Sequence, residues 1–223
     1  MEFLKPGRNL FVTPEARAAD VTSPMTSDQA LKELMAGNKR FINSMNESCM
    51  QSTLEHRMKV AEGQNPFAVI LACADSRVPP EIIFDQWIGD LFVVRVAGNI
   101  VTPQNYGILG SIEYGVAALG VNLIMVLGHS RCGAVDSAIK AIKSGTAYPG
   151  SIGTIVQAIK PSVEKAKSEP GDLLQNAIQE NVRLGVSRIN GTDPVIAPMV
   201  KEGKVKVVGG NYDLLTGEVT LVA

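Results

Sequence analysis

The sequence predicts an α/β fold with a central, mostly parallel β-sheet flanked by helices. Short runs of continuous apolar residues recur along the chain, which is typical of parallel strands covered on both faces. Longer stretches with apolar residues at three- and four-residue steps alternate with these runs and indicate helices. The 223 residues, 45% of them hydrophobic, are sufficient for one domain with a large core.

Four apolar runs are expected to form the parallel strands of this sheet. They cover residues 67–74, 91–96, 122–127 and 204–209. A turn sequence over residues 213–217 precedes a fifth run, residues 218–222, which is expected to be an antiparallel edge strand. The first run is apolar throughout, so it should be covered on both faces of the sheet.

Helices are predicted between these strands and before the first of them. Thr26 or Ser27 can cap a first helix, and a second helix is expected over residues 52–61. A short helical turn should begin at the two prolines at positions 79 and 80. The remaining helical patterns cover residues 108–119, 135–142, 152–163 and 174–189. Gly110 and Gly115 lie inside the pattern at 108–119, which predicts close backbone approach there.

Residues 1–25 are predicted to form an irregular N-terminal arm and residues 26–223 the folded domain. The arm lacks the apolar segment of a secretory signal, and the longest apolar run of the chain is too short to span a bilayer. A net charge of −1 without a basic run gives no support for a nucleic-acid or membrane-surface partner. Three cysteines do not make a disulfide framework, so a cytoplasmic protein is expected, with the periplasm as the alternative.

Two polar clusters follow predicted strands. Cys73, Asp75 and Arg77 come at the end of the first strand, and in an extended chain their side chains project to one side. His129 and Cys132 follow the third strand. Because sites in open α/β sheets form beyond the carboxyl ends of the strands, both clusters should lie at the same rim.

Two thiolates and one imidazole make a three-ligand zinc set that leaves the fourth tetrahedral position open, as in catalytic sites. Cys132 is expected at a helix N-terminus, which favours a thiolate, and Gly128 and Gly133 would let the backbone approach the metal. Each part has an ordinary interpretation as well. A cysteine is often a small buried hydrophobic residue, and Asp75 with Arg77 is compatible with a structural ion pair. Only the combination at one rim favours a metal site.

Cys73-Ala74-Asp75-Ser76-Arg77 and His129-Ser130-Arg131-Cys132-Gly133 resemble the zinc and catalytic motifs of the β-class carbonic anhydrases. The resemblance is in register from about Thr26 to the C-terminus. It implies one Zn²⁺ per chain, held by Cys73, His129 and Cys132. It also implies reversible hydration of CO2 to bicarbonate and a proton, carried out by a homo-oligomer, either a dimer or a tetramer.

The roles of Asp75 and Arg77 are argued from charge. Two thiolates neutralise the charge of Zn²⁺ more fully than imidazoles would, so the metal alone should acidify its bound water less. A hydrogen-bond acceptor beside the metal would then help to orient the zinc-bound hydroxide for its attack on CO2. An ionised Asp75 supplies this acceptor, and Arg77 keeps it ionised and in place. One branch of the family carries a tryptophan three residues before its first zinc cysteine and is inhibited by bicarbonate. Ile70 occupies that position here, so Asp75 is expected to stay paired with Arg77.

The resemblance to plant-like members places the substrate pocket at Gln64, Phe92 and Tyr114, with Gly133 beside the metal motif. Phe92 and Tyr114 are equally compatible with core positions, whereas a polar Gln64 just before a buried strand needs a partner. Ala97 stands where such members commonly carry valine, which leaves the pocket size open. The remaining candidates are weak: Cys49 is expected to be an ordinary thiol and His56 a solvated imidazole.

Three other functions are compatible with parts of this pattern. Close relatives hydrate CS2 or COS, and only pocket shape separates these substrates from CO2. A cysteine phosphatase that uses Cys132 would need an arginine about six residues later to bind phosphate, where the chain has Ala138. A noncatalytic zinc-stabilised domain would need a fourth protein ligand and leaves Asp75 and Arg77 without a purpose.

Overall fold

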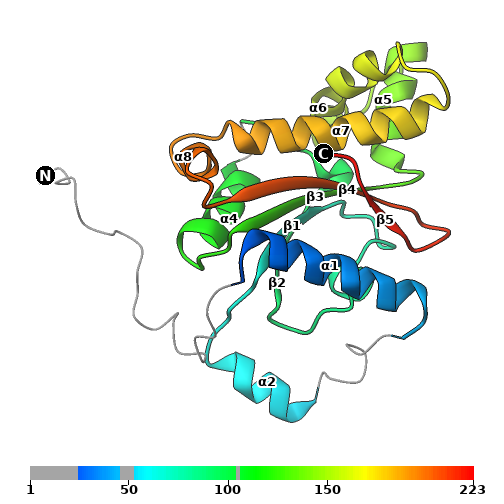
Figure 1. Cartoon of the computed structure of the whole chain (residues 1–223). Coiled ribbons are helices and arrows are strands. Elements are labelled where there is room, and N and C mark those ends of the chain that lie inside the picture. Colours follow the sequence, from blue (N-terminus) through cyan, green and yellow to red (C-terminus); the bar gives the residue numbers. More distant parts are fainter. Residues whose placement is uncertain (1–24, 46–52, 104–105) are drawn as a thin grey trace, which may run out of the picture.

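The structure is a computed structural model, and it describes residues 25–45, 53–103 and 106–223. The predicted α/β fold is confirmed, because five strands form one sheet in the order β2-β1-β3-β4-β5 (Figure 1). The strands are β1 (Ala68–Ala72), β2 (Leu91–Arg95), β3 (Leu123–His129), β4 (Lys206–Tyr212) and β5 (Val219–Leu221). The first four are parallel and β5 is antiparallel to β4, as the sequence predicted.

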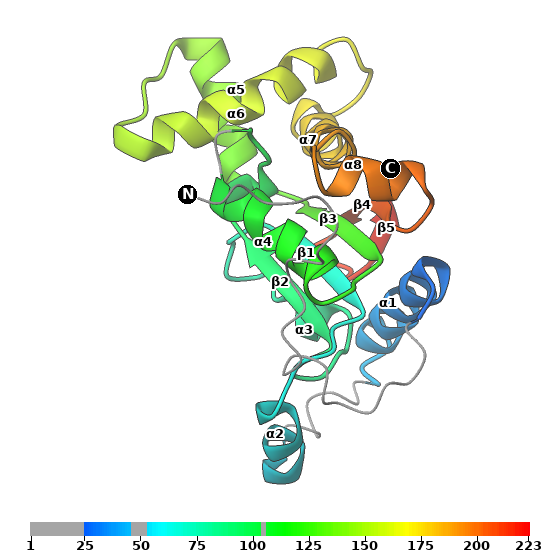
Figure 2. The same ribbon diagram turned by 90° about the vertical axis from the view of Figure 1, so that its left-hand side faces the viewer.

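Helices cover both faces of this sheet (Figures 1 and 2). On one face lie α1 (Ser27–Ile42) and α3 (Pro80–Ile83). On the other lie α4 (Tyr106–Ala117), α7 (Leu173–Asn190) and α8 (Ile196–Lys201). The remaining helices are α2 (Leu54–Ala61), the 3₁₀ turn η3 (Ala97–Asn99), α5 (Gly133–Ser144) and α6 (Gly150–Ala166), the last two of which pack against each other beside α7.

The central strand β1 is buried on both faces, which explains its unbroken apolar sequence. Its five residues have no exposed surface. Val69 and Leu71 face the core under α4 and α7, whereas Ile70 faces the core under α1. A charged residue at any of these positions would be removed from water without a partner, so the sequence here has little freedom.

Helix α1 packs on the sheet through apolar residues such as Leu34 and is also held by polar contacts. Thr26 caps it with a full capping box, as the sequence suggested. The buried amide of Asn38 donates to the carbonyls of Ile83 (3.1 Å) and Gly217 (2.8 Å), and its oxygen accepts from the N–H of Val219 (2.9 Å). One side chain therefore joins α1 to α3 and to the turn before β5.

The two glycines of α4 differ in how closely other residues pack against them, and the sequence does not distinguish them. A Cβ at Gly115 would lie 2.6 Å from Val69 Cγ2, so the predicted close approach of backbone is found there. A Cβ at Gly110 would meet nothing within 4 Å, so the same prediction is wrong for Gly110. This residue lies on the exposed side of the helix, where no neighbouring element packs.

Several element bounds differ from the expected ones. The strand predicted over residues 67–74 ends at Ala72, and the strands predicted to end at residues 127 and 209 continue to His129 and Tyr212. The last two extend because Gly128 and His129 pair in register with Asn211 and Tyr212. The six-residue helix α8 was not predicted, since it is too short to show a helical period. No helix within the described ranges combines the length and the apolar character needed to cross a membrane.

Two glycine-to-alanine substitutions should have opposite effects on stability. A Cβ at Gly37 of α1 would lie 1.7 Å from the carbonyl oxygen of Phe84, so Gly37→Ala should lower the free energy of unfolding by about 1–3 kcal/mol. Gly110→Ala is the matched control and should raise it by about 0.5–1 kcal/mol, because alanine favours a helix and meets no neighbour. Urea denaturation followed by circular dichroism measures both. Equal effects would show that the α1 contact is not tight.

Candidate metal centre

Cys73, His129 and Cys132 come together at the carboxyl rim of the sheet. Cys73 directly follows β1, His129 is the last residue of β3, and Cys132 is the N-cap of α5. Their sulfur and imidazole nitrogen atoms lie within 4.8 Å of one another. All three side chains are buried, with exposed fractions of 4%, 0% and 2%. The two segments that the sequence placed at one rim therefore meet.

The imidazole of His129 has one nitrogen bonded and one open. Nδ1 lies 2.9 Å from the carbonyl oxygen of Ser130, which can only accept, so Nδ1 carries the proton. Nε2 is buried and has no hydrogen-bond partner among the described residues. A buried acceptor without a partner destabilises a fold, and a metal ion would satisfy this lone pair.

A hydrogen bond joins the thiols of Cys73 and Cys132. This bond lowers the pKa of Cys73 to about 4, although burial opposes the shift. The N–H groups of Asp75 and Gly98 also donate to Cys73 Sγ, at 3.4 and 3.2 Å. The pKa of Cys132 is raised, first by its hydrogen bond to Cys73 and then by burial. One thiolate held by backbone donors and a neutral imidazole suit a soft divalent cation such as Zn²⁺.

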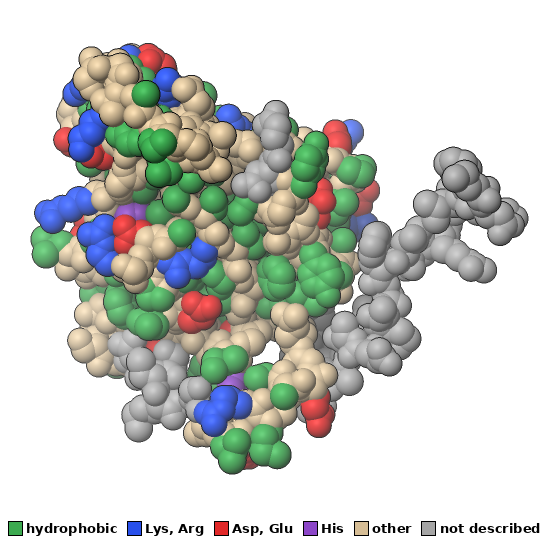
Figure 3. All heavy atoms as spheres, turned by 180° about the vertical axis from the view of Figure 1, so that it is seen from behind, with side chains coloured by type: hydrophobic (Ala, Val, Ile, Leu, Met, Phe, Trp, Pro, Cys, Tyr) green, Lys and Arg blue, Asp and Glu red, His purple; other side chains and the backbone are tan. Residues whose placement is uncertain are grey.

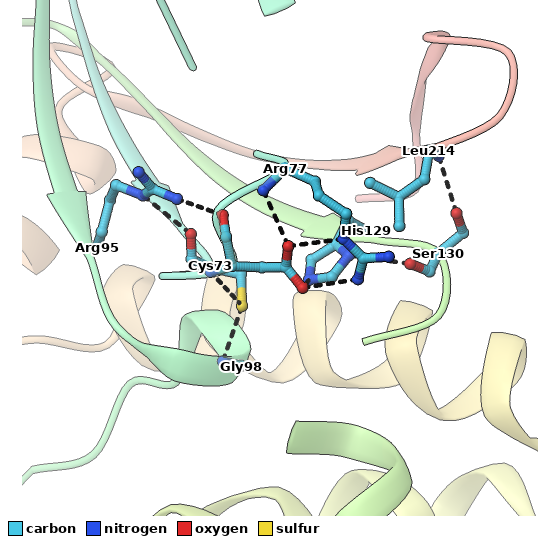
Figure 4. Close-up of polar contacts among 8 residues, drawn as sticks. Cys73, Arg77, Arg95, Gly98, His129, Ser130 and Leu214 are labelled. Carbon is cyan, nitrogen blue, oxygen red and sulfur yellow. Dashed lines mark hydrogen bonds and ion pairs between the residues drawn. The ribbon is translucent and has the colours of Figure 1, made fainter. Parts of the chain in front are cut away.

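Asp75 and Arg77 form a bidentate ion pair beside these ligands (Figure 4). Arg77 donates to Asp75 from Nε at 2.9 Å, from Nη2 at 2.8 Å and from its backbone N–H at 3.0 Å. These bonds hold the pKa of Asp75 well below its usual range, against the opposing effect of burial. Asp75 Oδ2 lies 3.9 Å from His129 Nε2, so an ionised acceptor adjoins the ligand cluster.

The arrangement of this pair differs from the sequence interpretation in one respect. Cys73, Asp75 and Arg77 were expected to share one side of an extended strand. Instead β1 ends at Ala72, and the N–H of Val78 closes a turn on the carbonyl of Asp75 at 3.0 Å. The turn, not strand alternation, brings the guanidinium back onto the carboxylate, because an Asp side chain readily accepts from the N–H two residues later.

A cleft of about 350 Å³ opens beside this pair. Its lining is formed by Arg77, Ser130, Arg131, Tyr212, Asp213, Leu214 and Leu215. Ser130 fixes one wall, because its hydroxyl accepts from the N–H of Leu214 at 2.9 Å (Figure 4). The exposed guanidinium of Arg77 therefore lies at a cleft that also holds Arg131 and Asp213.

Comparison with known proteins agrees with this site. The family model described as carbonic anhydrase matches residues 68–219, which contain all five residues of the metal cluster and the ion pair. The chain is 40% identical over 200 residues to carbonic anhydrase 2 of Mycobacterium tuberculosis, which covers 90% of this chain and 93% of that protein. It is 36% identical over 200 residues to the carbonic anhydrase of Mycolicibacterium smegmatis, with 90% and 94% covered.

This chain belongs to the β-carbonic anhydrase family. Among solved structures it is similar to one of two tetrameric β-carbonic anhydrases from Sordaria macrospora, with a TM-score of 0.68 and 26% identity over 86% of this chain and 95% of that chain. It is also similar to the β-carbonic anhydrase CcaA, with a TM-score of 0.65 and 28% identity over 86% and 94% of the two chains. The predicted enzyme class, a carbonate dehydratase, is thereby confirmed at the level of the family.

The residues expected to line a β-carbonic anhydrase substrate pocket are not beside the metal ligands of the same chain. Gln64 is exposed and precedes β1, whereas Cys73 follows it, so a strand of five residues, about 16 Å long, separates them. Phe92 pairs with Val69, four residues before Cys73, and its ring lies 6.0 Å from that of Tyr114 on α4. Phe92 and Tyr114 therefore lie near each other, and Phe92 and Gln64 lie toward the start of β1, away from the rim that holds the thiols.

The structure of this β-carbonic anhydrase changes two further sequence interpretations. Gly128 allows close packing, but against α7: a Cβ at Gly128 would lie 2.6 Å from Val182 Cγ2, whereas a Cβ at Gly133 would meet nothing within 4 Å. His56 is not simply solvated, because its Nε2 lies 2.8 Å from the carbonyl of Ile88 and its ring contacts Trp87. Cys49 and the N-terminal arm up to residue 24 lie outside the described residues.

Sequence reasoning missed two polar residues that hold the ligand loop. Arg95, the last residue of β2, donates to the carbonyls of Cys73 and Asp75. Asn181 of α7 donates to the carbonyl of Gly98 at 2.8 Å and so supports the turn whose N–H binds Cys73 Sγ. A charged residue at the carboxyl end of a parallel strand was a usable signal for Arg95. Nothing in the helical pattern distinguishes Asn181.

The chain has two histidines, which gives a matched test of the cluster. His129→Gln should lower the affinity for zinc at least about 100-fold, since it removes one of three ligands. His56→Gln should leave zinc affinity unchanged, because His56 contacts only the segment around Trp87 and Ile88. Competition with a chromophoric chelator measures both affinities. An unchanged affinity in the first variant would exclude His129 as a ligand.

Proposed function

We propose that this protein is a zinc enzyme that catalyses the reversible hydration of CO2 to bicarbonate and a proton. One observation carries the proposal: three buried soft or borderline donors meet at 4.8 Å or less, beside an ionised Asp75 that Arg77 holds in place. A purely structural zinc site would have four protein ligands. Among the described residues, the cluster contains three.

Cys73, His129 and Cys132 would hold one Zn²⁺ per chain. When bound, the metal would supply the Lewis acidity that brings the pKa of water into the neutral range. The protein contributes the orientation of its own ligands. The bond from His129 Nδ1 to Ser130 fixes the imidazole with Nε2 toward the thiols, and the start of α5 supplies N–H groups to Cys132.

Asp75 orients the attacking water. An ionised carboxylate only accepts hydrogen bonds, so it favours a partner that carries a proton to donate. Both of its oxygens are already engaged by Arg77, which leaves their remaining lone pairs for this water. Bicarbonate has fewer protons to offer at the reacting oxygen than the water that formed it, so the same acceptor favours release of the product.

The substrate pocket is proposed to need a second chain. Gln64 precedes β1 and Phe92 pairs with Val69 near the start of β1, whereas Cys73 follows the end of that strand. Phe92 belongs to the edge strand β2, and the exposed hydrophobic residues of α4 include Tyr106 and Tyr114. Figure 3 shows hydrophobic side chains exposed among polar ones on the face of the molecule that is seen from behind Figure 1. Together with the tetrameric state named for the Sordaria macrospora proteins, these features support a homo-oligomer, a dimer or a tetramer.

The proposal is tested by stopped-flow hydration of CO2 with a pH indicator, on protein whose zinc content is measured in parallel. Fast hydration that disappears with the metal and returns on adding zinc is expected. Stoichiometric zinc without hydration of CO2 would overturn the proposal, and assays with CS2 and COS would then identify the substrate. Two thiol ligands suit a reducing cytoplasm, where the enzyme is proposed to act.

Asp75→Asn should lower kcat about 100-fold while zinc remains bound, since it replaces an ionised acceptor by a group that also donates. Asp28→Asn is the control, because Asp28 is exposed on α1 and pairs with Lys206. Stopped-flow rates and zinc content are measured on both. Full activity of the Asp75 variant would remove this residue from the mechanism.

Arg77→Gln should move the acidic limb of the activity profile to higher pH. Arg77 is the main cause of the low pKa of Asp75, and burial acts in the opposite direction. Without Arg77 the carboxyl group takes up a proton at a higher pH, and activity is lost from that pH downward. The profile of kcat/KM against pH measures the shift. Arg131→Gln, which alters the other arginine of the cleft, should leave the limb in place.

A further inference from the structure

Arg95 makes two hydrogen bonds to the loop that carries Cys73 and Asp75. It is the last residue of β2, which lies beside β1 in the sheet. Its Nε donates to the carbonyl of Cys73 at 3.0 Å, and its Nη2 donates to the carbonyl of Asp75 at 2.5 Å (Figure 4). The guanidinium of Arg95 therefore binds the main chain at two residues, the proposed metal ligand Cys73 and the neighbouring Asp75.

The two bonds of Arg95 lie at the end of the backbone hydrogen bonding between β1 and the β2 segment. The last backbone bonds between β1 and the segment after β2 join Ala72 and Ala74 to Val96. Cys73 lies between these two bonded residues and Asp75 directly after them, and both follow the end of β1 at Ala72. The guanidinium fork supplies donors at this point, with its two N–H groups at a fixed spacing.

Arg95 has no acidic partner among the described residues, whereas Arg77 is paired with Asp75. The charge of Arg95 is therefore directed at main-chain oxygens of the ligand loop. This differs from an ordinary surface ion pair, which would join two side chains and leave the loop backbone free.

We propose that Arg95 is a positioning residue that fixes the Cys73 sulfur relative to the Asp75 carboxylate by holding both carbonyls of the loop. The inference rests on the proposed function, because it assigns this geometry to a zinc site. Cys73 Sγ keeps its donor from Gly98, and Asp75 keeps its bonds to Arg77, when Arg95 is removed. Loss of Arg95 should therefore make the distance between the Cys73 sulfur and the Asp75 carboxylate more variable. The bond from Gly98 to Cys73 and the bonds from Arg77 to Asp75 should remain.

The test compares Arg95→Met, which keeps the length of the side chain without donors, with Arg95→Lys, whose ammonium is a compact point donor that lacks the fixed fork. Arg183→Met is the matched control, because Arg183 donates to the carbonyl of Val222, far along the chain from the ligand loop. Five quantities are measured: zinc affinity by chelator competition, the visible spectrum of the Co²⁺-substituted protein, kcat for CO2, KM for CO2, and the midpoint of thermal unfolding.

Arg95→Met is expected to lose about 10–100-fold in zinc affinity or kcat, with a changed Co²⁺ spectrum. Arg95→Lys should fall between this variant and the wild type, and Arg183→Met should keep the wild-type affinity and spectrum. Wild-type affinity, spectrum and kcat in Arg95→Met would overturn the inference. If that variant does not fold, the same result in folded Arg95→Lys would overturn it.

The two proposals fail in different ways. A zinc-loaded wild type that does not hydrate CO2 would contradict the proposed function, and zinc affinity and the Co²⁺ spectrum would still decide the role of Arg95. An active wild type whose Arg95 variants retain affinity, spectrum and kcat would contradict only the positioning role.

Discussion

The parallel pairing of β1 and β3 is the constraint on which the site depends. Both strands are buried on both faces, and their register aligns Ala72 with Leu127. Because the strands run in the same direction, the residues that follow them emerge at one rim. Cys73 and His129 are 56 positions apart in sequence yet become neighbours for this reason alone. Cys132, the N-cap of α5, follows three residues after His129 and lies at the same rim.

At this rim, hydrogen bonds from different elements hold Cys73, His129 and the turn at Asp75. The sulfur of Cys73 is held from η3, the ring of His129 from its own loop, and the turn at Asp75 from β2. The thiols also border an apolar cluster built by α5, α6 and α7. Burial strengthens the electrostatic interactions within the site. Because the hydrogen-bond donors belong to several elements, the geometry of the site depends on the whole domain.

The sequence predicts the parts of this protein that depend on local pattern. Apolar segments located the strands, and the helical pattern that follows Cys132 placed this residue at the start of a helix. It did not locate features that depend on distant contacts. Gly110 and Gly115 look alike in sequence, yet only Gly115 has a strand packed against it. Arg95 and Asn181 act through main-chain carbonyls of other elements, and such bonds leave no period or motif in the chain.

The buried amide of Asn38 also constrains the order in which the chain can assemble. Its partners lie 45, 179 and 181 residues later in the sequence. During synthesis α1 leaves the ribosome well before the carbonyl of Gly217 and the N–H of Val219. The hydrogen bonds that join Asn38 to these two groups therefore form only after the chain up to β5 has been made. Contacts of such high sequence separation slow folding, so this buried amide is expected to find its last partners late.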